Sequence, residues 1–247
     1  MIFDVKKFLQ DILLLLGYQI RKKNKFFIDP NHYQVLLPKV DKEWKLIIES
    51  KKKTLNNEQD LLTNIRFYSL IQNINFILKQ RKVFDFVELG CWNGHSSYII
   101  SKLIKKSKKN IKFHIFDSFE GLSEPTKEDR SDYKIKQRFK GNEEFIKNKL
   151  LKSFKFVEIY PGWIPKRFKI LKNKKFSFVP IDLCLYKPTI QSLNFFYKKL
   201  KKGGIIISNS YNSNIFKGET KAWDEFFSKN KYSFMYKHAL TTSFVIK

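Results

Sequence analysis

The sequence lacks the features that mark secreted, zinc-binding and membrane-spanning proteins. Its two cysteines, Cys91 and Cys184, form no CxxC pair, which argues against a zinc site or a disulfide scaffold. It has no run of 18 uncharged apolar residues, and its best apolar run, residues 12–16, is too short to span a membrane. Residues 1–20 carry two aspartates and end without a small-residue cleavage site, so they make a poor signal peptide. We therefore expect a cytoplasmic protein.

Arginine is also scarce, although the chain is strongly basic. Six arginines stand against 43 lysines, and the formal net charge is +26. Such a charge is typical of proteins that bind nucleic acids or anionic surfaces. Phosphate and base recognition, however, favours the planar guanidinium of arginine, and several lysine runs follow apolar helical stripes, where cations complement the backbone dipole. We therefore favour a general enrichment in lysine over a nucleic-acid partner, which the charge alone does not exclude.

Short apolar segments alternate with helical stripes over most of the chain. Strands are expected at residues 83–89, 111–116, 156–160, 176–181 and 205–207, helices at 59–80, after Gly94, at 188–200 and at 219–229, and a closing pair of strands at 232–238 and 241–246. This alternation predicts an α/β fold with a mostly parallel sheet and helices on both faces.

The first 58 residues carry no motif that assigns them a function. A helix is expected at residues 1–20 and strands at 33–37 and 44–48, before a polar stretch at 51–58. We therefore divide the chain into an N-terminal α/β appendage, 1–58, and a main domain, 59–247. The aromatic and aliphatic residues of the appendage suit a lid over a substrate or a contact between subunits of a homo-oligomer, and the sequence does not decide between them.

Three motifs lie at the carboxyl ends of expected strands, where parallel sheets bind ligands. Gly90 and Gly94 are spaced GxxxG, which allows a tight turn and a close approach of backbone to ligand, or simply a compact strand–helix turn. Asp117 ends the next strand and can accept hydrogen bonds from ribose hydroxyls, or cap a turn. Asp182 ends the strand at 176–181 and can orient a substrate, accept a proton or bind a cation, or cap the following helix.

Six segments in order resemble the macrocin O-methyltransferase (TylF-type) family over about residues 60–247. They are ELGCWNGHS at 88–96, FDSFEGLSEP at 116–125, PGWIP at 161–165, IDLCLYKPT at 181–189, GGIIISNSY at 203–211 and GETKAWDEF at 218–226. The resemblance implies a Rossmann-like class I methyltransferase fold with a seven-stranded sheet and S-adenosylmethionine (SAM) as methyl donor. It also implies methyl transfer to a hydroxyl of a small acceptor, by analogy a sugar or glycan.

The resemblance also implies roles for individual residues. It places Glu88, Gly90 and Gly94 around the methionine moiety of SAM. It places Asp117 at the ribose hydroxyls, with Ser118 and Phe119 beside Asp117. Near the adenine it places Gly162 and Trp163. Asp182 would lie near the sulfonium and the acceptor hydroxyl.

This sequence departs from the family at the positions that hold a divalent cation. Family members typically show Asp-x-Asp-x-Tyr and Asp-Asp-Tyr, whereas this chain has Asp182, Cys184, Asn209 and Ser210, so three of four acids are missing. Magnesium prefers hard oxygen ligands, and only Asp182 and the Asn209 carbonyl qualify. We therefore expect a weak magnesium site or none.

Without a cation, a side chain must accept the acceptor's proton. Asp182 is the first candidate and His238, in the closing strand pair, is another, whereas His95 is expected to have a structural role. Two alternative functions remain. A nucleic-acid (RNA) methyltransferase is suggested by the charge, although the subclass that methylates amino groups of bases is disfavoured, since no Asn/Asp-Pro-Pro-Tyr/Phe string follows the fourth strand. A non-catalytic protein on this fold is suggested by Asn209 and Ser210.

Overall fold

The computed structural model describes residues 42–54, 61–129, 138–213, 215–237 and 242–247, all within the compact unit Val40–Lys247. The helix predicted at 1–20, the strand predicted at 33–37, the predicted boundary at 58/59 and His238 lie outside these residues. Among the helices of the described part, none is long and apolar enough to cross a bilayer.

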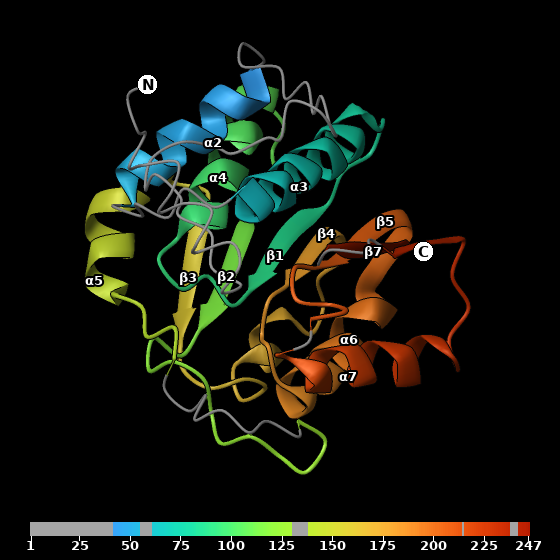
Figure 1. The fold of residues 1–247 in the computed structure, drawn as a ribbon. Helices are drawn as coiled ribbons and strands as arrows, with labels where there is room; N and C mark the ends of the chain where they lie inside the picture. Colours follow the sequence, from blue (N-terminus) through green and yellow to red (C-terminus); the bar gives the residue numbers. More distant parts are fainter. Residues whose placement is uncertain (1–41, 55–60, 130–137, 214, 238–241) are drawn as a thin grey trace, which may run out of the picture. The chain divides into compact units, whose positions relative to one another are not determined.

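The described residues form one seven-stranded sheet in the order β3-β2-β1-β4-β5-β7-β6 (Figure 1). The strands are β1 (Asp85–Leu89), β2 (Phe113–Asp117), β3 (Val157–Pro161), β4 (Phe176–Ile181), β5 (Leu200–Ser208), β6 (Phe234–Lys237) and β7 (Ser243–Ile246). The first five pair in parallel, and β7 pairs antiparallel with both β5 and β6. The predicted fold class, a mostly parallel sheet, is confirmed. Because the strand order reverses between β1 and β4, the carboxyl ends of these two strands open a crevice.

Alternate residues of the central strand β1 enter two different cores. In β1, Phe86 packs in the core under α3 (Leu61–Lys79) and α4 (His95–Ser107), whereas Val87 and Leu89 pack in the core under α6 (Tyr186–Lys199) and α7 (Lys217–Phe227). This follows from the two-residue period of a strand, and it explains why the buried strands read as continuous apolar runs. Figure 1 shows the two helix layers on opposite sides of the sheet.

The segment at residues 44–48 is helical, so the strand predicted there is wrong. It belongs to α2 (Lys42–Lys53), which contacts α3 and α4, and Ile47 is fully buried in the core beneath them. A short apolar run does not distinguish a strand from one buried side of a helix, and the flanking lysines and glutamates are good helix formers. Helix α2 thus packs on the same helix layer as α3 and α4. A short helix, α5 (Glu143–Phe145), continues as a π-helical turn over Ile146–Leu150.

Candidate active site

A cavity of about 800 Å³ lies at the carboxyl ends of β1, β2, β4 and β5, and we call it the strand-end cavity. Its walls come from the loops after these strands, from the N-terminal part of α3 and from the segments 121–126 and 163–166. Six of the predicted site residues line it, namely Gly90, Asp117, Ser118, Trp163, Asp182 and Asn209. Its size is that of a pocket for a ligand of a few hundred daltons.

Four other predicted residues do not line this cavity. The Glu88 side chain is buried within β1, and Gly94, Phe119 and Gly162 neighbour lining residues without lining the cavity themselves. The Cβ that an alanine at Gly94 would carry lies 2.6 Å from Leu150 Cδ2, so this glycine gives room for the packing of the π-helical turn.

Asp117 ties the ends of β1 and β2 together through its carboxylate. Its Oδ2 accepts hydrogen bonds from the amides of Cys91, at 2.7 Å, and Trp92, at 3.0 Å, and its Oδ1 accepts one from the amide of Phe119, at 2.7 Å. A carboxylate oxygen can accept two hydrogen bonds, so Oδ1 keeps one site for a ligand hydroxyl. The arrangement fits a ribose at this position, held by a side chain that already fixes the loop.

The turn after β1 requires glycine for a steric reason. Gly90 has a φ of 85°, and a Cβ at this position would lie 2.2 Å from the backbone oxygen of Asp182. The close approach is maintained by the amide of Asp182, which donates to Leu89 O at 2.9 Å. Gly90 therefore brings the ends of β1 and β4 together at the crevice.

Glu88, in β1, lies beneath this turn and is almost fully buried. It is 1 % exposed, its Oε2 accepts a short hydrogen bond from Ser97 Oγ, and its Oε1 has no partner among the described residues. Burial raises the pKa of Glu88 to about 8, so the carboxyl group holds a proton at neutral pH.

Asp182 presents a half-buried carboxylate to the cavity. Ser210 Oγ donates to its Oδ1 at 2.9 Å, which joins the ends of β4 and β5. Arg66, from α3, also lines the cavity and reaches the same strand end, since its Nη1 lies 3.4 Å from Asn209 O. The Asn209 side chain is almost fully buried, and its Oδ1 has no partner among the described residues.

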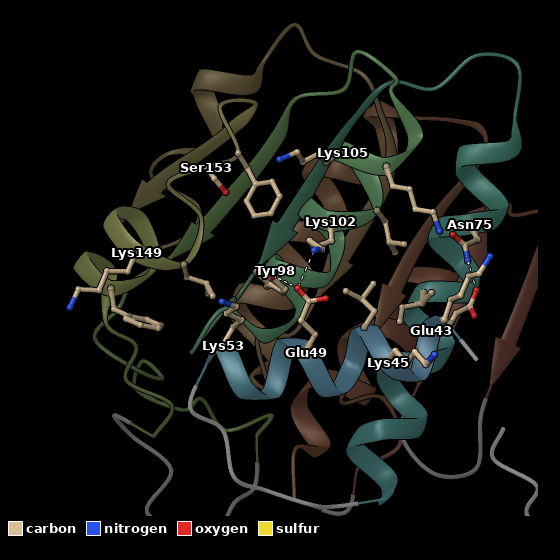
Figure 2. Close-up of a pocket in the computed structure, with 18 residues that line it drawn as sticks. Glu43, Lys45, Glu49, Lys53, Asn75, Tyr98, Lys102, Lys105, Lys149 and Ser153 are labelled. Carbon is tan, nitrogen blue, oxygen red and sulfur yellow. Dashed lines mark hydrogen bonds and ion pairs between the residues drawn. The ribbon is translucent and has the colours of Figure 1, made fainter. Parts of the chain in front are cut away.

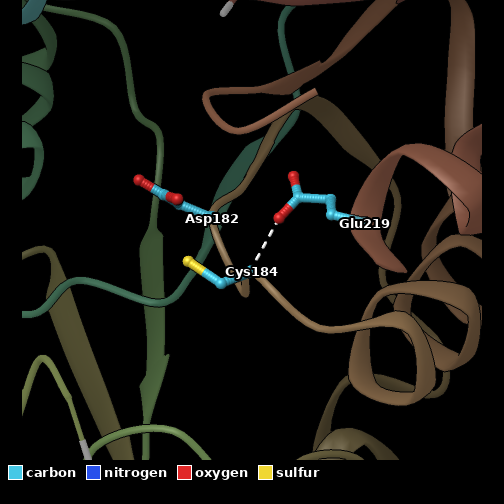
Figure 3. A group of neighbouring side chains, drawn as sticks. All are labelled: Asp182, Cys184 and Glu219. Atoms are coloured by element: carbon cyan, nitrogen blue, oxygen red, sulfur yellow. Dashed lines mark hydrogen bonds between the residues drawn. The ribbon is translucent and has the colours of Figure 1, made fainter. Parts of the chain in front are cut away.

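Glu219 is a buried acid at this site that the sequence analysis did not identify. It is fully buried in the first turn of α7, and its Oε2 accepts a hydrogen bond from the amide of Cys184 at 2.7 Å (Figure 3). Its Oε1 accepts a short hydrogen bond from Ser208 Oγ. Burial, and then the charge of Asp182, raise the pKa of Glu219 above its usual range. Glu219 thus joins α7 to the ends of β4 and β5.

Asp182, Cys184 and Glu219 each place one potential metal ligand within 4.8 Å of the others (Figure 3). Their chemistry does not fit a hard cation. Burial raises the pKa of the Cys184 thiol, which therefore stays neutral, and both oxygens of Glu219 already accept hydrogen bonds from protein groups. The predicted pair, Asp182 and Asn209, offers one carboxylate and one amide oxygen, so water or substrate oxygens would have to supply most of the six ligands of a magnesium ion there.

His95 begins α4 at the edge of the cavity. It is packed against Phe67, with ring centroids 3.9 Å apart, and its backbone oxygen accepts a hydrogen bond from Ser50 Oγ at 2.9 Å. Burial, and then the positive charge of Lys51, lower the pKa of His95 to about 3, so the imidazole is neutral and a weak proton acceptor. These contacts support the structural role expected for His95.

One wall of the cavity is fixed by Asp129, which is almost fully buried. Its Oδ1 accepts a hydrogen bond from the amide of Tyr186 at 2.7 Å, at the start of α6, and its Oδ2 accepts one from the amide of Thr126 at 2.6 Å. Gly218 makes room for this carboxylate, since a Cβ there would lie 1.9 Å from Asp129 Oδ1. The segment 121–126, which lines the cavity, is thereby anchored to α6.

Aromatic side chains form another part of the wall. Trp92 packs edge-on against Phe139, with ring centroids 5.4 Å apart, and Phe139 lies 6.1 Å from Phe216. All three line the cavity, as does Trp163. Such rings offer broad apolar faces for flat or ring-shaped ligands.

The sequence profile of the macrocin O-methyltransferase (TylF) family matches residues 52–237, which is most of the chain. The chain belongs to this family. It is therefore a SAM-dependent O-methyltransferase. The strand-end cavity lies at the carboxyl ends of the parallel strands, where open α/β sheets bind ligands, and Asp117 and Asp182 line it. The sequence matches none of the curated proteins with which it was compared.

Solved structures share the fold of this macrocin O-methyltransferase family member. The O-methyltransferase NovP is 21% identical with a TM-score of 0.57, and the match covers 75% of this chain and 78% of NovP. CalS11, a calicheamicin methyltransferase, is 15% identical with a TM-score of 0.58, and the match covers 90% of this chain and 99% of CalS11. The apo structure of CalS11, described as a TDP-rhamnose 3'-O-methyltransferase, gives a TM-score of 0.54 at 14% identity, over 82% of this chain and 93% of that one. At these identities the likeness establishes the fold.

Proposed function

We propose that the chain methylates a hydroxyl group of a sugar or glycan, with SAM bound in the strand-end cavity. The acceptor class is supported by the family and by the description of CalS11 as a TDP-rhamnose 3'-O-methyltransferase. The aromatic wall of Trp92, Phe139 and Phe216 supports it as well, because its apolar ring faces can pack against the C–H faces of a pyranose.

The residues present fit SAM. Asp117 Oδ1 keeps an acceptor site for a ribose hydroxyl, and the cavity has the volume for a nucleoside with an amino-acid arm. Gly90 lets the backbone approach the ligand, and Trp163 lines the wall on which we place the adenine. SAM supplies a methyl group on a sulfonium, which an attacking oxygen can displace.

The chain's own task is to orient the acceptor and to take one proton from its hydroxyl group. Asp182 is the proposed general base, since its carboxylate faces the cavity and Ser210 fixes one of its oxygens. Arg66 and Ser210 lie at the same strand end and can position the acceptor's oxygens. The observation that carries the proposal is this placement of Asp182 in the same cavity as Asp117.

Because the donor set does not fit a hard cation, we propose that the reaction proceeds without a firmly held magnesium ion. Asp182 then carries the proton transfer that a cation would otherwise assist. Cys184 and Glu219 support the position of the loop that carries Asp182, since the Cys184 amide donates a hydrogen bond to Glu219.

Methyl transfer to defined sugars tests this function. The chain is incubated with methyl-labelled SAM and a panel of free sugars, nucleotide-linked sugars and a structured RNA, and the products are separated and counted. Label on a sugar, lost in Asp182→Asn, is the expected result. Label on the RNA alone contradicts the acceptor class, and binding of SAM with no transfer to any acceptor contradicts the catalytic assignment.

A further inference from the structure

A second cavity, of about 930 Å³, lies on the outer side of the helix layer formed by α2, α3 and α4 (Figure 2). We call it the basic cavity. Its described lining comes from α2, α3 and α4, from α5 with the π-helical turn, and from Ser153 and Phe154. None of these residues lines the strand-end cavity, so the two sites are separate.

Lysine is concentrated around this cavity beyond its general abundance in the chain. Seven of the eighteen described lining residues are lysine, against 43 of 247 in the whole sequence. They are Lys42, Lys45, Lys53, Lys102, Lys105, Lys106 and Lys149. Figure 2 shows five of them, Lys45, Lys53, Lys102, Lys105 and Lys149, on different helices around the cavity. No arginine is among the described lining residues, in contrast to the strand-end cavity.

The two acids of the cavity offset only part of this charge, since they stand against seven lysines. Glu49 accepts hydrogen bonds from Tyr98 Oη at 2.6 Å and from Lys102 Nζ at 3.0 Å, so it is already used within the wall. Glu43 Oε1 is 3.3 Å from Asn75 Nδ2. Among the described residues no carboxylate forms an ion pair with any of the other six lysines. The cavity therefore concentrates uncompensated positive charge, which attracts an anion.

The floor of the basic cavity is apolar and lies below the lysines. Ile71, Leu103, Leu150 and Phe154 are buried residues that line it. The lysine ammonium groups are carried on exposed residues such as Lys45, Lys53 and Lys149. A ligand that contacts the floor therefore needs an apolar part, and a ligand that pairs with the lysines needs an anionic group.

Two broader partners fit this shape less well. A flat bilayer contacts projecting side chains, whereas these apolar groups lie at the bottom of a hollow. A nucleic-acid strand stacks successive bases on several aromatic faces, but Lys102 lies over Tyr98, 5.8 Å from the ring centre, and Lys105 lies over Phe154, at 5.7 Å, which leaves Phe145 alone among the described aromatic lining residues without a cation over its ring.

We propose that the basic cavity binds single molecules of an amphipathic anion, with an apolar body on the floor and a phosphate or carboxylate head among the lysines. Ammonium groups bind such heads as point charges, and the lysine stems extend the apolar surface. The site does not depend on the function proposed for the strand-end cavity. The two are joined by α4, whose first residue, His95, lines one cavity while Tyr98 and Lys102 line the other.

Calorimetry with dodecyl phosphate, kept below its critical micelle concentration, tests this proposal. Inorganic phosphate and dodecyl maltoside serve as probes that carry only the charge or only the apolar body. The cavity variant carries Lys45→Gln, Lys53→Gln, Lys105→Gln and Lys149→Gln. The control variant carries Lys169→Gln, Lys175→Gln, Lys229→Gln and Lys231→Gln, which are exposed, line neither cavity and remove the same charge.

We expect dodecyl phosphate to bind the unmodified chain one to one, and more tightly than either single-feature probe. The cavity variant should bind it about tenfold more weakly, as the loss of four modest charge interactions implies, and the control variant should bind it as the unmodified chain does. The proposal is overturned if the unmodified chain does not bind dodecyl phosphate below its critical micelle concentration. It is also overturned if both variants lose the same affinity for dodecyl phosphate, or if the unmodified chain binds inorganic phosphate or dodecyl maltoside as tightly. The thermal transition and the affinity for S-adenosylhomocysteine, measured on all three proteins, show that the variants are folded. Failure of all three to bind S-adenosylhomocysteine concerns the proposed function and not this site.

Discussion

The amide of Cys184 donates a hydrogen bond to the carboxyl group of Glu219, 2.7 Å away, across the space between the end of β4 and the first turn of α7. Glu219 also accepts from Ser208 at the end of β5, and Ser208 Oγ in turn accepts from the amide of Tyr211 at 2.9 Å. One buried side chain therefore connects the loop that follows Asp182 to the end of β5. The position of the proposed base depends on a residue that does not itself line the cavity.

Glu219→Ala should lower the free energy of unfolding by ~1–3 kcal/mol, because the buried amide of Cys184 loses its acceptor. Glu219→Gln keeps a carbonyl oxygen at the same place and should cost less. Urea unfolding of both variants measures the difference. If Glu219→Ala unfolds at the same urea concentration as the unmodified chain, the bridging role is wrong.

Gly90→Ala should be far more damaging than Gly203→Ala. Both glycines have a positive φ, of 85° and 72°, so both variants incur a backbone strain of roughly 1–2 kcal/mol. Only at Gly90 would the new Cβ meet backbone, at 2.2 Å from Asp182 O, whereas at Gly203 the nearest atom is Gln80 Nε2 at 3.8 Å. Gly90→Ala should lose S-adenosylhomocysteine binding or fail to fold, and Gly203→Ala should retain both. Equal behaviour of the two variants would contradict the close approach.

Glu88 should make the chain less stable as the pH rises. Its folded-state pKa of about 8 lies above the ordinary value of 4.5, so between these pH values the folded state binds more protons than the unfolded state. Its contribution to stability is fully present below about pH 4.5 and is lost as the pH rises through 8, with a slope of at most ~1.4 kcal/mol per pH unit. Glu88→Gln lacks this contribution. Denaturant unfolding from pH 5 to 8 should therefore show that the free energy of unfolding of the unmodified chain falls relative to that of Glu88→Gln. If the free energies of the two proteins change in parallel with pH, the assignment is wrong.

Asp182→Asn should lower kcat by ~10²–10⁴ and leave the affinity for S-adenosylhomocysteine nearly unchanged, because the amide cannot accept the acceptor's proton. Ser210→Ala should have a smaller effect, since it removes a hydroxyl group that orients Asp182 and contacts the acceptor but leaves the proposed base in place. Initial rates at saturating SAM separate the two variants. A chelator such as EDTA should leave the unmodified rate unchanged, and a rate abolished by EDTA and restored by Mg²⁺ would show that a cation is required.

The sequence was sufficient to predict the sheet, because its buried strands are apolar runs bounded by polar residues. The strand at residues 176–181 has the predicted bounds. Asp117 and Asp182 could be predicted to line a common cavity because ligands bind at the carboxyl ends of parallel strands. The segment at 44–48 was mistaken for a strand because five residues are too few to show a helical period. Its burial depends on contacts with α3 and α4 that no local pattern reveals.

Glu219 was missed for a different reason. It stands among charged residues, yet it shares one face of α7 with Ala222, Trp223 and Phe226, all of which are buried. An acid on the apolar stripe of a helix is a signal of a buried carboxyl group with protein partners. Arg66 gave no comparable signal, since its place in the cavity depends on where α3 meets the end of β5.

Calorimetry of S-adenosylhomocysteine binding is the most direct test of the central claim, that the strand-end cavity holds the methyl donor with Asp117 at its ribose. The unmodified chain is compared with Asp117→Ala and with Asp85→Asn, which changes an acid at the opposite end of β1 and outside the cavity. We predict one-to-one binding that weakens at least about tenfold in Asp117→Ala, as the loss of a hydrogen bond to a charged group implies, and does not change in Asp85→Asn. No binding by the unmodified chain, or equal affinity of all three proteins, would contradict the account.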